Sequence, residues 1–519
     1  MTKRLPALAL LAATLGILGG AAALWWVRLQ PDPIQILTPP PTASVEAGVT
    51  RQDRRDRQVA LARTLVQEND YRGAVAALDR ALEAMPGDAE ALALQVRALR
   101  AQRRYTAARG AALRIQDAYP DSALAHILLG SIATQQGDAA TARRDIERAV
   151  EIDPSSAQAL AQLAALDLME GKIGEARWRA ARSLAMEPDN PTGLRVMAKL
   201  VRGRPELLSI MRRLLEAVPD DQLTRAWMEV LSASTAPEVN FIAPILGQVE
   251  VPLEPDPDGR FYVRADVGTL THLRLLVDTG ASGMVLAEAA ARRLGMKLLE
   301  FSESAGLGGL TRHSHPILIH RLAVGPMRAR EVMATASNLP QPIDGIINPL
   351  IFAPPGSGIM MELQPVRQRL IFRTASGAGT ADGRWVSVPY LADGYHIIFR
   401  IILAGEPSMA LLDTGAAVEL IDRSVMRRLP GAVVLSSHDA GTTLLGFGGQ
   451  IDDAETIEQV PLRIAGRDMT TRRLFLVDLN EESFRFMVDL DAIVGIDRLK
   501  LFDLRVDPGA GRLFFRPLP

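Results

Sequence analysis

Hydrophobic and polar residues follow three different patterns in succession along this chain. Residues 5–27 form an apolar run without a charge. From about Arg55 to residue 221, alanine and leucine recur at helical spacing among arginine and glutamate residues. Beyond about Ala236 this spacing ends, and short β-branched runs alternate with glycine, proline and aspartate. The patterns predict an apolar segment, then an all-α region, then an all-β region.

The apolar run is long enough to cross a bilayer as one helix. Trp25 and Trp26 at its end suit the interface of a membrane, so we favour a retained anchor. A cleaved signal peptide stays open as the alternative, because small residues near the end of the run suit a signal peptidase. We predict a membrane anchor or signal segment at residues 1–29 and a proline-rich linker at residues 30–54. The rest is expected to be periplasmic or extracytoplasmic, or secreted if the segment is cleaved.

The helical region repeats itself every 34 residues, as its prolines show. They are Pro86, Pro120, Pro154 and Pro188. A unit of this length that ends in proline indicates a pair of helices that must stack on its neighbours to bury its apolar face. In the third unit, Leu129 and Gly130 fall on the first helix, and Ala142 falls where the two helices cross. The pattern resembles the tetratricopeptide repeat, which implies an all-α solenoid over residues 55–235 with a groove for a peptide segment or a partner protein.

The β-rich region carries one motif twice. An apolar run ends in Asp-Thr-Gly at residues 278–280 and again at residues 413–415. Each copy follows a Val-Pro and an Asp-Gly pair, and each precedes a helical stretch and a glycine-rich turn, GLGG at 306–309 and GFGG at 446–449. Similar runs, QRLIFR and GRLFFR, close the two halves. One Asp-Thr-Gly is weak evidence, but two in matched contexts indicate a duplicated domain.

These motifs resemble the retropepsin-like aspartic proteases, in which each half supplies an Asp-Thr-Gly loop, a glycine-rich flap and an apolar segment that ends in glycine. The resemblance implies a multidomain α + β chain that ends in an all-β bilobal acid-protease domain, with lobe 1 at residues 236–378 and lobe 2 at residues 379–519. It also implies the site residues. The catalytic pair is Asp278 and Asp413, the residues that support the active loops are Thr279, Gly280, Ser282, Thr414 and Gly415, and the flaps are Gly306, Leu307, Gly308 and Gly309 in lobe 1 and Gly446, Phe447, Gly448 and Gly449 in lobe 2.

Duplication has a chemical reason, because two carboxyls that share one site cannot both ionise. One stays protonated while the other acts as base, so the pair can activate a water for attack on a peptide bond. Which carboxyl is protonated stays open. Ser282 could donate to the outer oxygen of Asp278, whereas Ala417 stands at the matching place in lobe 2. The two carboxyls are therefore expected to differ in pKa.

Composition limits the partners and cofactors. Lysine plus arginine (58) nearly balance aspartate plus glutamate (60), so no basic excess indicates nucleic acid. Cysteine is absent, which excludes disulfides, thiolate metal sites and cysteine nucleophiles. His313 and His315 could share a face of a strand, but the sequence identifies no third ligand, and we favour a role in the flap strand over a zinc pair. We predict no metal and no cofactor.

Asn348 departs from the family pattern, since lobe 2 has Gly495 at the matching place. This departure favours a rival interpretation, a non-catalytic tetratricopeptide scaffold with a degenerate protease-like peptide-binding domain. A second rival pairs the lobes between two chains. Two intact Asp-Thr-Gly loops favour the enzyme, because a binding module needs no paired carboxyls. We therefore expect a membrane-anchored aspartic endopeptidase whose repeats recruit a protein substrate or an adaptor.

Overall fold

The computed structural model describes residues 50–299 without interruption and shorter stretches beyond them. These stretches are residues 302–304, 312–339, 342–374, 384–428, 434–435, 444–446, 449–451, 455–457, 460–470, 474–479, 483 and 486–518. The predicted anchor at residues 1–29 and most of the linker lie outside them. Among the described helices, none is both long and apolar enough to cross a membrane. The described residues fall into two compact units, 50–166 with 176–197, and 167–175 with 198–518.

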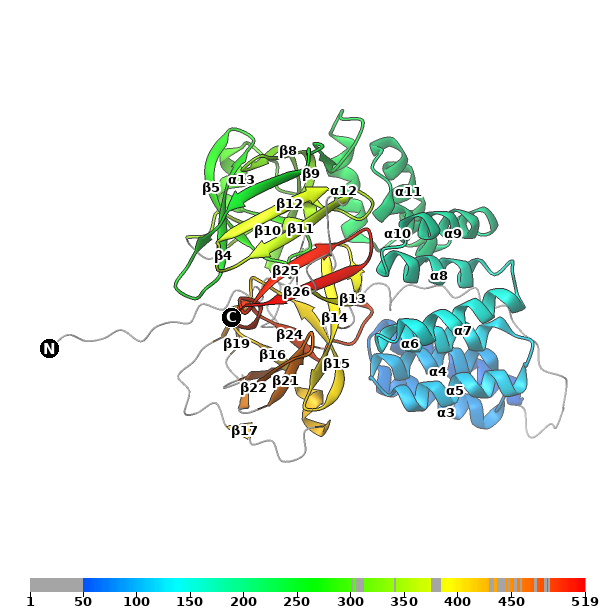
Figure 1. Cartoon of the computed structure of the whole chain (residues 1–519). Helices are drawn as coiled ribbons and strands as arrows, with labels where there is room; N and C mark the ends of the chain where they lie inside the picture. The colour runs from blue at the N-terminus through cyan, green and yellow to red at the C-terminus, as the bar shows by residue number, and fades with distance from the viewer. Residues whose placement is uncertain are drawn as a thin grey trace. The chain divides into compact units, whose positions relative to one another are not determined.

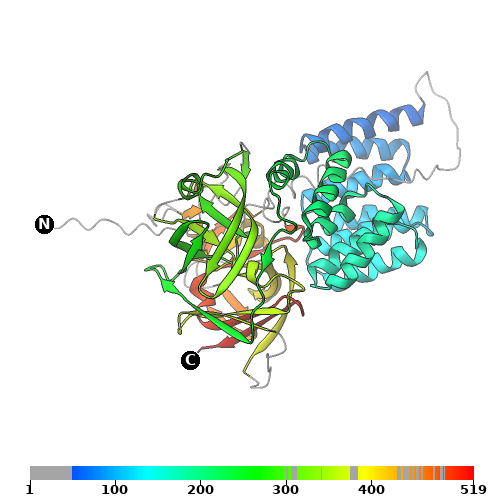
Figure 2. The same ribbon diagram turned by 90° about the horizontal axis from the view of Figure 1, so that it is seen from above.

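The first unit is a row of antiparallel helix pairs, coloured from blue through cyan to teal in Figures 1 and 2. The helices are α2 (Arg51–Gln67), α3 (Tyr71–Ala84), α4 (Ala89–Ala101), α5 (Tyr105–Ala118), α6 (Ala123–Gln135), α7 (Ala139–Ile152), α8 (Ala157–Met169), α9 (Ile173–Met186) and α10 (Pro191–Leu200). A Cβ on Gly130 would lie 2.4 Å from Ile146 Cγ1 and 3.2 Å from Ala142 O, so glycine allows α6 and α7 to cross this closely. The predicted solenoid of paired helices is confirmed.

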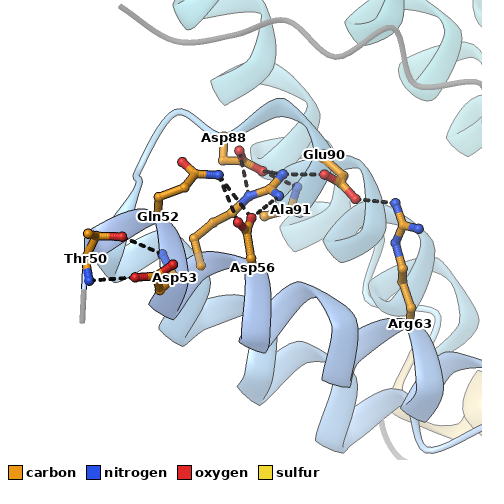
Figure 3. Close-up of polar contacts among 9 residues, drawn as sticks. Thr50, Gln52, Asp53, Asp56, Arg63, Asp88, Glu90 and Ala91 are labelled. Carbon is orange, nitrogen blue, oxygen red and sulfur yellow. Dashed lines mark hydrogen bonds and ion pairs between the residues drawn. The ribbon is translucent and has the colours of Figure 1, made fainter. Parts of the chain in front are cut away.

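Polar contacts fix the start of the first helix and join it to the next repeat (Figure 3). Thr50 Oγ1 accepts the N–H of Asp53 at 3.0 Å, and Asp53 accepts the N–H of Thr50 at 3.0 Å, which is a capping box. Arg55 donates to both carboxyl oxygens of Asp88, at 2.8 and 3.0 Å. Asp88 in turn caps α4 by accepting the N–H of Ala91 at 2.7 Å. The Arg55 side chain therefore links α2 to the first turn of α4.

Helices α11 (Arg204–Ala217) and α12 (Gln222–Ser232) belong to the second unit, together with the strands of lobe 1. The lobe 1 elements are β1 (Phe241–Ile242), β3 (Glu254–Pro255), β4 (Phe261–Val267), β5 (Leu270–Val277), β6 (Met284–Ala287), α13 (Glu288–Arg293), β7 (Ser302–Ser304), β8 (Arg312–Val324), β9 (Met327–Ser337), β10 (Gly345–Ile347) and η1 (Pro349–Phe352). Because α11 and α12 group with the strands, the boundary between the compact units lies before residue 235, where the solenoid was predicted to end.

Lobe 2 repeats these elements. They are β13 (Val386–Asp393), β14 (His396–Leu403), β15 (Glu406–Leu412), β16 (Leu420–Asp422), η3 (Arg423–Arg428), β17 (Val434–Leu435), β18 (Leu444–Gly446), β19 (Gly449–Ile451), β20 (Glu455–Ile457), β21 (Pro461–Ile464), β22 (Arg467–Thr470), β23 (Leu474–Val477), β24 (Ala492–Val494) and α15 (Ile496–Leu499). In lobe 1, β5 runs parallel to β10, which is antiparallel to β6. In lobe 2, β15 runs parallel to β24, which is antiparallel to β16. The duplication seen in the sequence is therefore a duplication of strand topology.

The two lobes share one sheet. It consists of β2 (Gln248–Pro252), β11 (Ile359–Gln364), β12 (Arg369–Thr374), β25 (Phe502–Asp507) and β26 (Arg512–Pro517), extended by β13. Strand β11 of lobe 1 pairs antiparallel with β25 of lobe 2, and Met361 lies opposite Val506. Buried Glu362 accepts hydrogen bonds from Arg505 and Arg373, each at 3.0 Å. The sheet joins the hydrophobic cores of both lobes into one core.

Candidate active site

The two Asp-Thr-Gly loops leave the ends of matching strands. The N–H of Asp278, directly after β5, donates to Ile347 O at the end of β10, at 2.9 Å. The N–H of Asp413, directly after β15, donates to Val494 O at the end of β24, at 3.1 Å. Both aspartates are fully buried. Since each loop follows the same pair of parallel strands, the duplicated topology places the two aspartates in equivalent positions.

The threonines of the two loops hold them together. The backbone N–H of Thr279 donates to Thr414 Oγ1 at 3.1 Å, and the N–H of Thr414 donates to Thr279 Oγ1 at 3.0 Å. Each hydroxyl donates in turn to the last residue of the opposite strand: Thr279 to Leu412 O at 2.8 Å, and Thr414 to Val277 O at 2.9 Å. The two loops of a single chain thus meet in one site.

Glycine is needed at residue 280 because the facing carboxyl lies against the backbone. A Cβ there would lie 2.6 Å from Asp413 Cγ and 2.7 Å from its Oδ2. The inner oxygens are held by backbone donors: Gly280 N–H binds Asp278 Oδ1 at 2.7 Å, while Asp413 Oδ1 accepts the N–H groups of Gly415 and Ala416, each at 2.9 Å. The outer oxygens, Oδ2 of both aspartates, have no donor among the described residues.

The surroundings change the acidity of both groups. Burial raises the pKa of Asp278 well above its ordinary value, and the neighbouring Asp413 raises it further. Burial also raises the pKa of Asp413, to about 6, against the lowering effect of the hydrogen bond from Asp278 and the N–H groups of Ala416 and Gly415. Each carboxyl thus changes the pKa of the other. The raised pKa values favour a state in which the two carboxyls share a proton.

Comparison with known proteins agrees with this geometry. Residues 263–347 match the family model for aspartyl proteases. Residues 59–123 and 94–157 match the family model for the tetratricopeptide repeat. The first match covers the Asp278 loop and the strands that hold it. The prediction of a protease-like domain fused to tetratricopeptide repeats is therefore confirmed.

Solved structures of both kinds are similar to parts of the chain at low identity. The match to the aspartic proteinase from Irpex lacteus has 14% sequence identity and a TM-score of 0.34, and it covers 52% of this chain and 97% of the proteinase chain. Basic 7S globulin from soybean is 12% identical, with coverages of 52% and 95% and a TM-score of 0.32. A tetratricopeptide protein of Thermus thermophilus is 20% identical, with coverages of 35% and 100% and a TM-score of 0.30. No curated protein matches the chain significantly.

Asn348 does not weaken the first lobe of the protease-like domain, contrary to the doubt raised by the sequence. Its fully buried side chain donates to Thr279 O at 3.0 Å and to Ala281 O at 2.8 Å, and it accepts the N–H of Leu350 at 3.0 Å. The family glycine is kept at Gly495, where a Cβ would lie 2.4 Å from a backbone oxygen of the active loop. Lobe 2 has no room for a side chain at the matching residue, whereas lobe 1 accommodates the Asn348 side chain and satisfies its hydrogen bonds. The asparagine therefore gives no reason to regard the site as degenerate.

Ser282 does not make the contact predicted for it. Asp278 Oδ2 has no donor among the described residues, and Ser282 Oγ lies 3.5 Å from His396 Nε2 instead. Sequence reasoning missed this histidine, which begins β14 and is buried. A signal was present, because the duplicated halves read DGRF and DGYH, so that His396 replaces Phe261 at an apolar position.

The predicted flaps lie mostly outside the described residues. This is so for Gly306, Leu307, Gly308 and Gly309 and for Phe447 and Gly448. Gly446 pairs with Gly449 at the end of the hairpin formed by β18 and β19.

His313 and His315, for which the sequence favours a role in the flap strand over a zinc pair, belong to β8. His315 contacts Leu299 O and lies 3.6 Å from a carboxyl oxygen of Glu288. Across the described stretches, no group of three or more histidine, aspartate or glutamate side chains is placed to hold a metal ion.

Proposed function

We propose that this protein is an aspartic endopeptidase in which Asp278 and Asp413 activate a water for attack on a peptide bond. The observation that most supports this proposal is the buried pair of carboxyls on matching loops. The inner oxygen of each carboxyl is held by backbone N–H groups, and the outer oxygen has no donor in the described structure. A structural turn aspartate has no need of a second buried carboxyl, since like charges at such a site are unfavourable.

The backbone donors favour one assignment of roles. Asp413 Oδ1 accepts two N–H groups at 2.9 Å. Asp278 Oδ1 accepts that of Gly280 at 2.7 Å, and the N–H of Ala281, which also lowers the pKa of Asp278, donates to the backbone carbonyl of Asp278 at 3.3 Å. Hydrogen bonds to a carboxylate stabilise its charged form. Asp413 is therefore the base and Asp278 the protonated acid, consistent with a pKa of about 6 for Asp413 and with a pKa of Asp278 that burial and the neighbouring Asp413 raise well above its ordinary value.

The reaction follows from these roles. Asp413 takes a proton from the water, whose oxygen bonds to the scissile carbonyl carbon, while Asp278 gives its proton to the carbonyl oxygen. The resulting diol then returns a proton to Asp278, and Asp413 passes its proton to the amide nitrogen as the carbon–nitrogen bond breaks. The products are a carboxyl and an amino terminus, and the pair again holds one proton.

The other parts of the chain place this chemistry near its substrate. The tetratricopeptide solenoid recruits a protein substrate or an adaptor in its groove, which raises the local concentration of cleavable segments at the site. The apolar run at residues 5–27 anchors the protein in a membrane, so substrates are drawn from its extracytoplasmic surroundings. No cofactor takes part.

The test is cleavage of a diverse peptide library across pH by the full-length protein in mild detergent. The wild type is compared with Asp278→Asn and Asp413→Asn, and with Asp468→Asn, which changes an exposed aspartate on β22 that pairs with Arg463. Cleavage by the wild type and by the Asp468 variant, but by neither active-loop variant, is the expected result. Equal activity in all four proteins would refute the proposal, as would a wild type that cleaves nothing.

Recruitment by the repeats is tested with a deletion of residues 51–152, which removes α2 to α7 whole and leaves α8 to α12 with the protease-like unit. Cleavage of a short library-derived peptide should persist, while cleavage of the native protein substrate should fall. Equal loss of both activities would count against a recruiting role.

A further inference from the structure

Three consecutive backbone carbonyls of the first active loop are bound by side chains from outside it. Asn348 Nδ2 donates to Thr279 O at 3.0 Å and to Ala281 O at 2.8 Å. His396 Nε2 lies 3.0 Å from Gly280 O, between them in sequence. A carbonyl oxygen only accepts, and His396 Nδ1 lies 2.9 Å from Asp393 O as well, so Nε2 donates to Gly280 O in the protonation states that place a proton on it. Two residues that do not belong to the Asp-Thr-Gly motif therefore contact the backbone carbonyls of this loop.

The orientation of both side chains is fixed by their other contacts. Asn348 Oδ1 accepts the N–H of Leu350, which leaves the amide nitrogen to face the loop carbonyls. His396 Nδ1 lies 2.9 Å from Asp393 O, and its ring packs on Phe486 with centroids 4.6 Å apart. Both side chains are buried.

The bound carbonyls belong to the peptide groups whose N–H groups support Asp278. The carbonyl of Thr279 and the N–H of Gly280 form one peptide group, and that N–H donates to Asp278 Oδ1 at 2.7 Å. The next peptide group joins the Gly280 carbonyl to the N–H of Ala281, which also lowers the pKa of Asp278. A donor at the carbonyl end of a peptide polarises it and strengthens the hydrogen bond from its N–H end.

The arrangement is not symmetric between the lobes. Gly495 stands where lobe 1 has Asn348, and Phe261 stands where the lobe 2 hairpin has His396. Glycine and phenylalanine offer no side-chain donor. The two departures from the duplicated pattern thus converge on the loop that carries Asp278.

We propose that Asn348 and His396 are positioning residues that hold the Asp278 loop and, through its peptide groups, make Asp278 a better proton donor to the substrate. The proposal rests on the proposed aspartic endopeptidase function. As Asp278 gives up its proton, negative charge develops on its carboxyl, and the polarised N–H groups stabilise that charge. The effect belongs to the transition state, so it acts on kcat more than on KM.

The first test uses Asn348→Leu and His396→Phe, which keep shape and remove donors. Asn348→Leu changes no titratable group, so any change in pH dependence must come from a neighbour: Asp278 itself, Asp413 on the facing loop, or His396 on β14. We expect kcat to fall with KM nearly unchanged, and the alkaline limb of the kcat/KM profile to rise by about one pH unit, the shift expected from one lost net hydrogen bond. An unmoved limb would overturn the proposal.

A matched control separates positioning from general loss of stability. Asn190 is also buried, and its Oδ1 accepts the N–H of Gly193 at 3.0 Å in the helical unit. Asn190→Leu makes the same chemical change far along the chain from the active loops. It should lower stability while leaving kcat and both limbs of the pH profile in place.

The second test needs no activity. The folded-state pKa of Asp278 is raised, so the stability linked to it is present at low pH and is lost as pH rises through that pKa. Asn348→Leu raises this pKa further, so its loss of thermal stability should grow with pH in the full-length protein and should stop growing in an Asp278→Asn background. The same loss at every pH in both backgrounds would show a purely structural role. If the wild type cleaves no peptide but this coupling is found, the endopeptidase function fails while the link between Asn348 and Asp278 stands.

Discussion

Thr279 and Thr414 exchange hydrogen bonds across the two active loops, each hydroxyl accepting the backbone N–H of the other at 3.0–3.1 Å. Each hydroxyl then donates to the strand that ends at the other loop, at 2.8–2.9 Å. Neither threonine can satisfy these buried groups within its own lobe. The hydrogen bonds that pair the two lobes therefore also assemble the site.

Replacing Thr279 with valine should destabilise the protease-like unit by about 2–3 kcal/mol, since two hydrogen bonds are lost and buried partners stay unsatisfied. Adding Thr414→Val should cost less than a second full increment, because the two threonines form one network. Denaturant unfolding of the single and double variants measures both effects. Thr335→Val is the matched control: Thr335 is buried in β9, and its hydroxyl has no hydrogen-bond partner in the described structure. A Thr279→Val variant as stable as this control would contradict the prediction.

Asp413→Asn should stabilise the protein at pH 8 and leave its stability nearly unchanged at pH 3.5. The pKa of Asp413 is raised from 3.8 to about 6, so ionisation destabilises the folded state as pH rises through that range, by about 3 kcal/mol at most. Asparagine removes this cost, and its oxygen still accepts the two N–H groups. Thermal unfolding at the two pH values checks the difference.

The control for this experiment has the opposite sign. A hydrogen bond from Arg463 lowers the pKa of exposed Asp468, so Asp468→Asn should lose a little stability above pH 4 and none below it. An Asp413→Asn variant that is less stable than the wild type at pH 8 would show that the buried carboxyl does not carry the raised pKa.

Gly495, behind the active loop of lobe 2, should tolerate substitution much less well than Gly110 in the helical unit. A Cβ on Gly495 would lie 2.4 Å from Val418 O and 2.8 Å from Ala416 O, and backbone atoms cannot rotate away. Gly495→Ala should therefore cost about 1–3 kcal/mol or more and reduce activity. Gly110→Ala in α5, where an added Cβ meets nothing within 4 Å, should instead stabilise by up to about 1 kcal/mol. Equal effects of the two substitutions on the unfolding midpoint would contradict this account.

Arg55→Met should loosen the first tetratricopeptide repeat. Arg55 makes a two-point contact with Asp88, and only 12% and 8% of the two side chains are exposed. Because the pair is not fully buried, we expect a loss of about 1–3 kcal/mol, less than for a pair in the deep interior. Hydrogen exchange should quicken in α2 and the first turn of α4. Arg148→Met, which removes an exposed pair with Glu151 on α7, should leave exchange unchanged; similar exchange in both variants would argue against the role of Arg55.

Much of the fold could be predicted because repetition in the sequence reports repeated packing. Prolines at a 34-residue interval marked the ends of helix pairs, and Asp-Thr-Gly in matched contexts marked strands that end at one site. The prediction failed where an assignment depended on what lies across the lobes. Ser282 was expected to contact Asp278 Oδ2, but its neighbour is His396, 114 residues further along the chain.

The sequence by itself determined the order of a helical repeat region and a duplicated β domain, and it singled out Asp278 and Asp413, because periodicity and paired motifs are local properties of the chain. Only the tertiary structure decided what Asn348 does. In the sequence it is a missing glycine, and in the fold it is a donor to the backbone of the active loop. The physical reason is that a buried polar side chain stabilises or disrupts according to the partners that packing brings to it, and those partners come from distant parts of the chain.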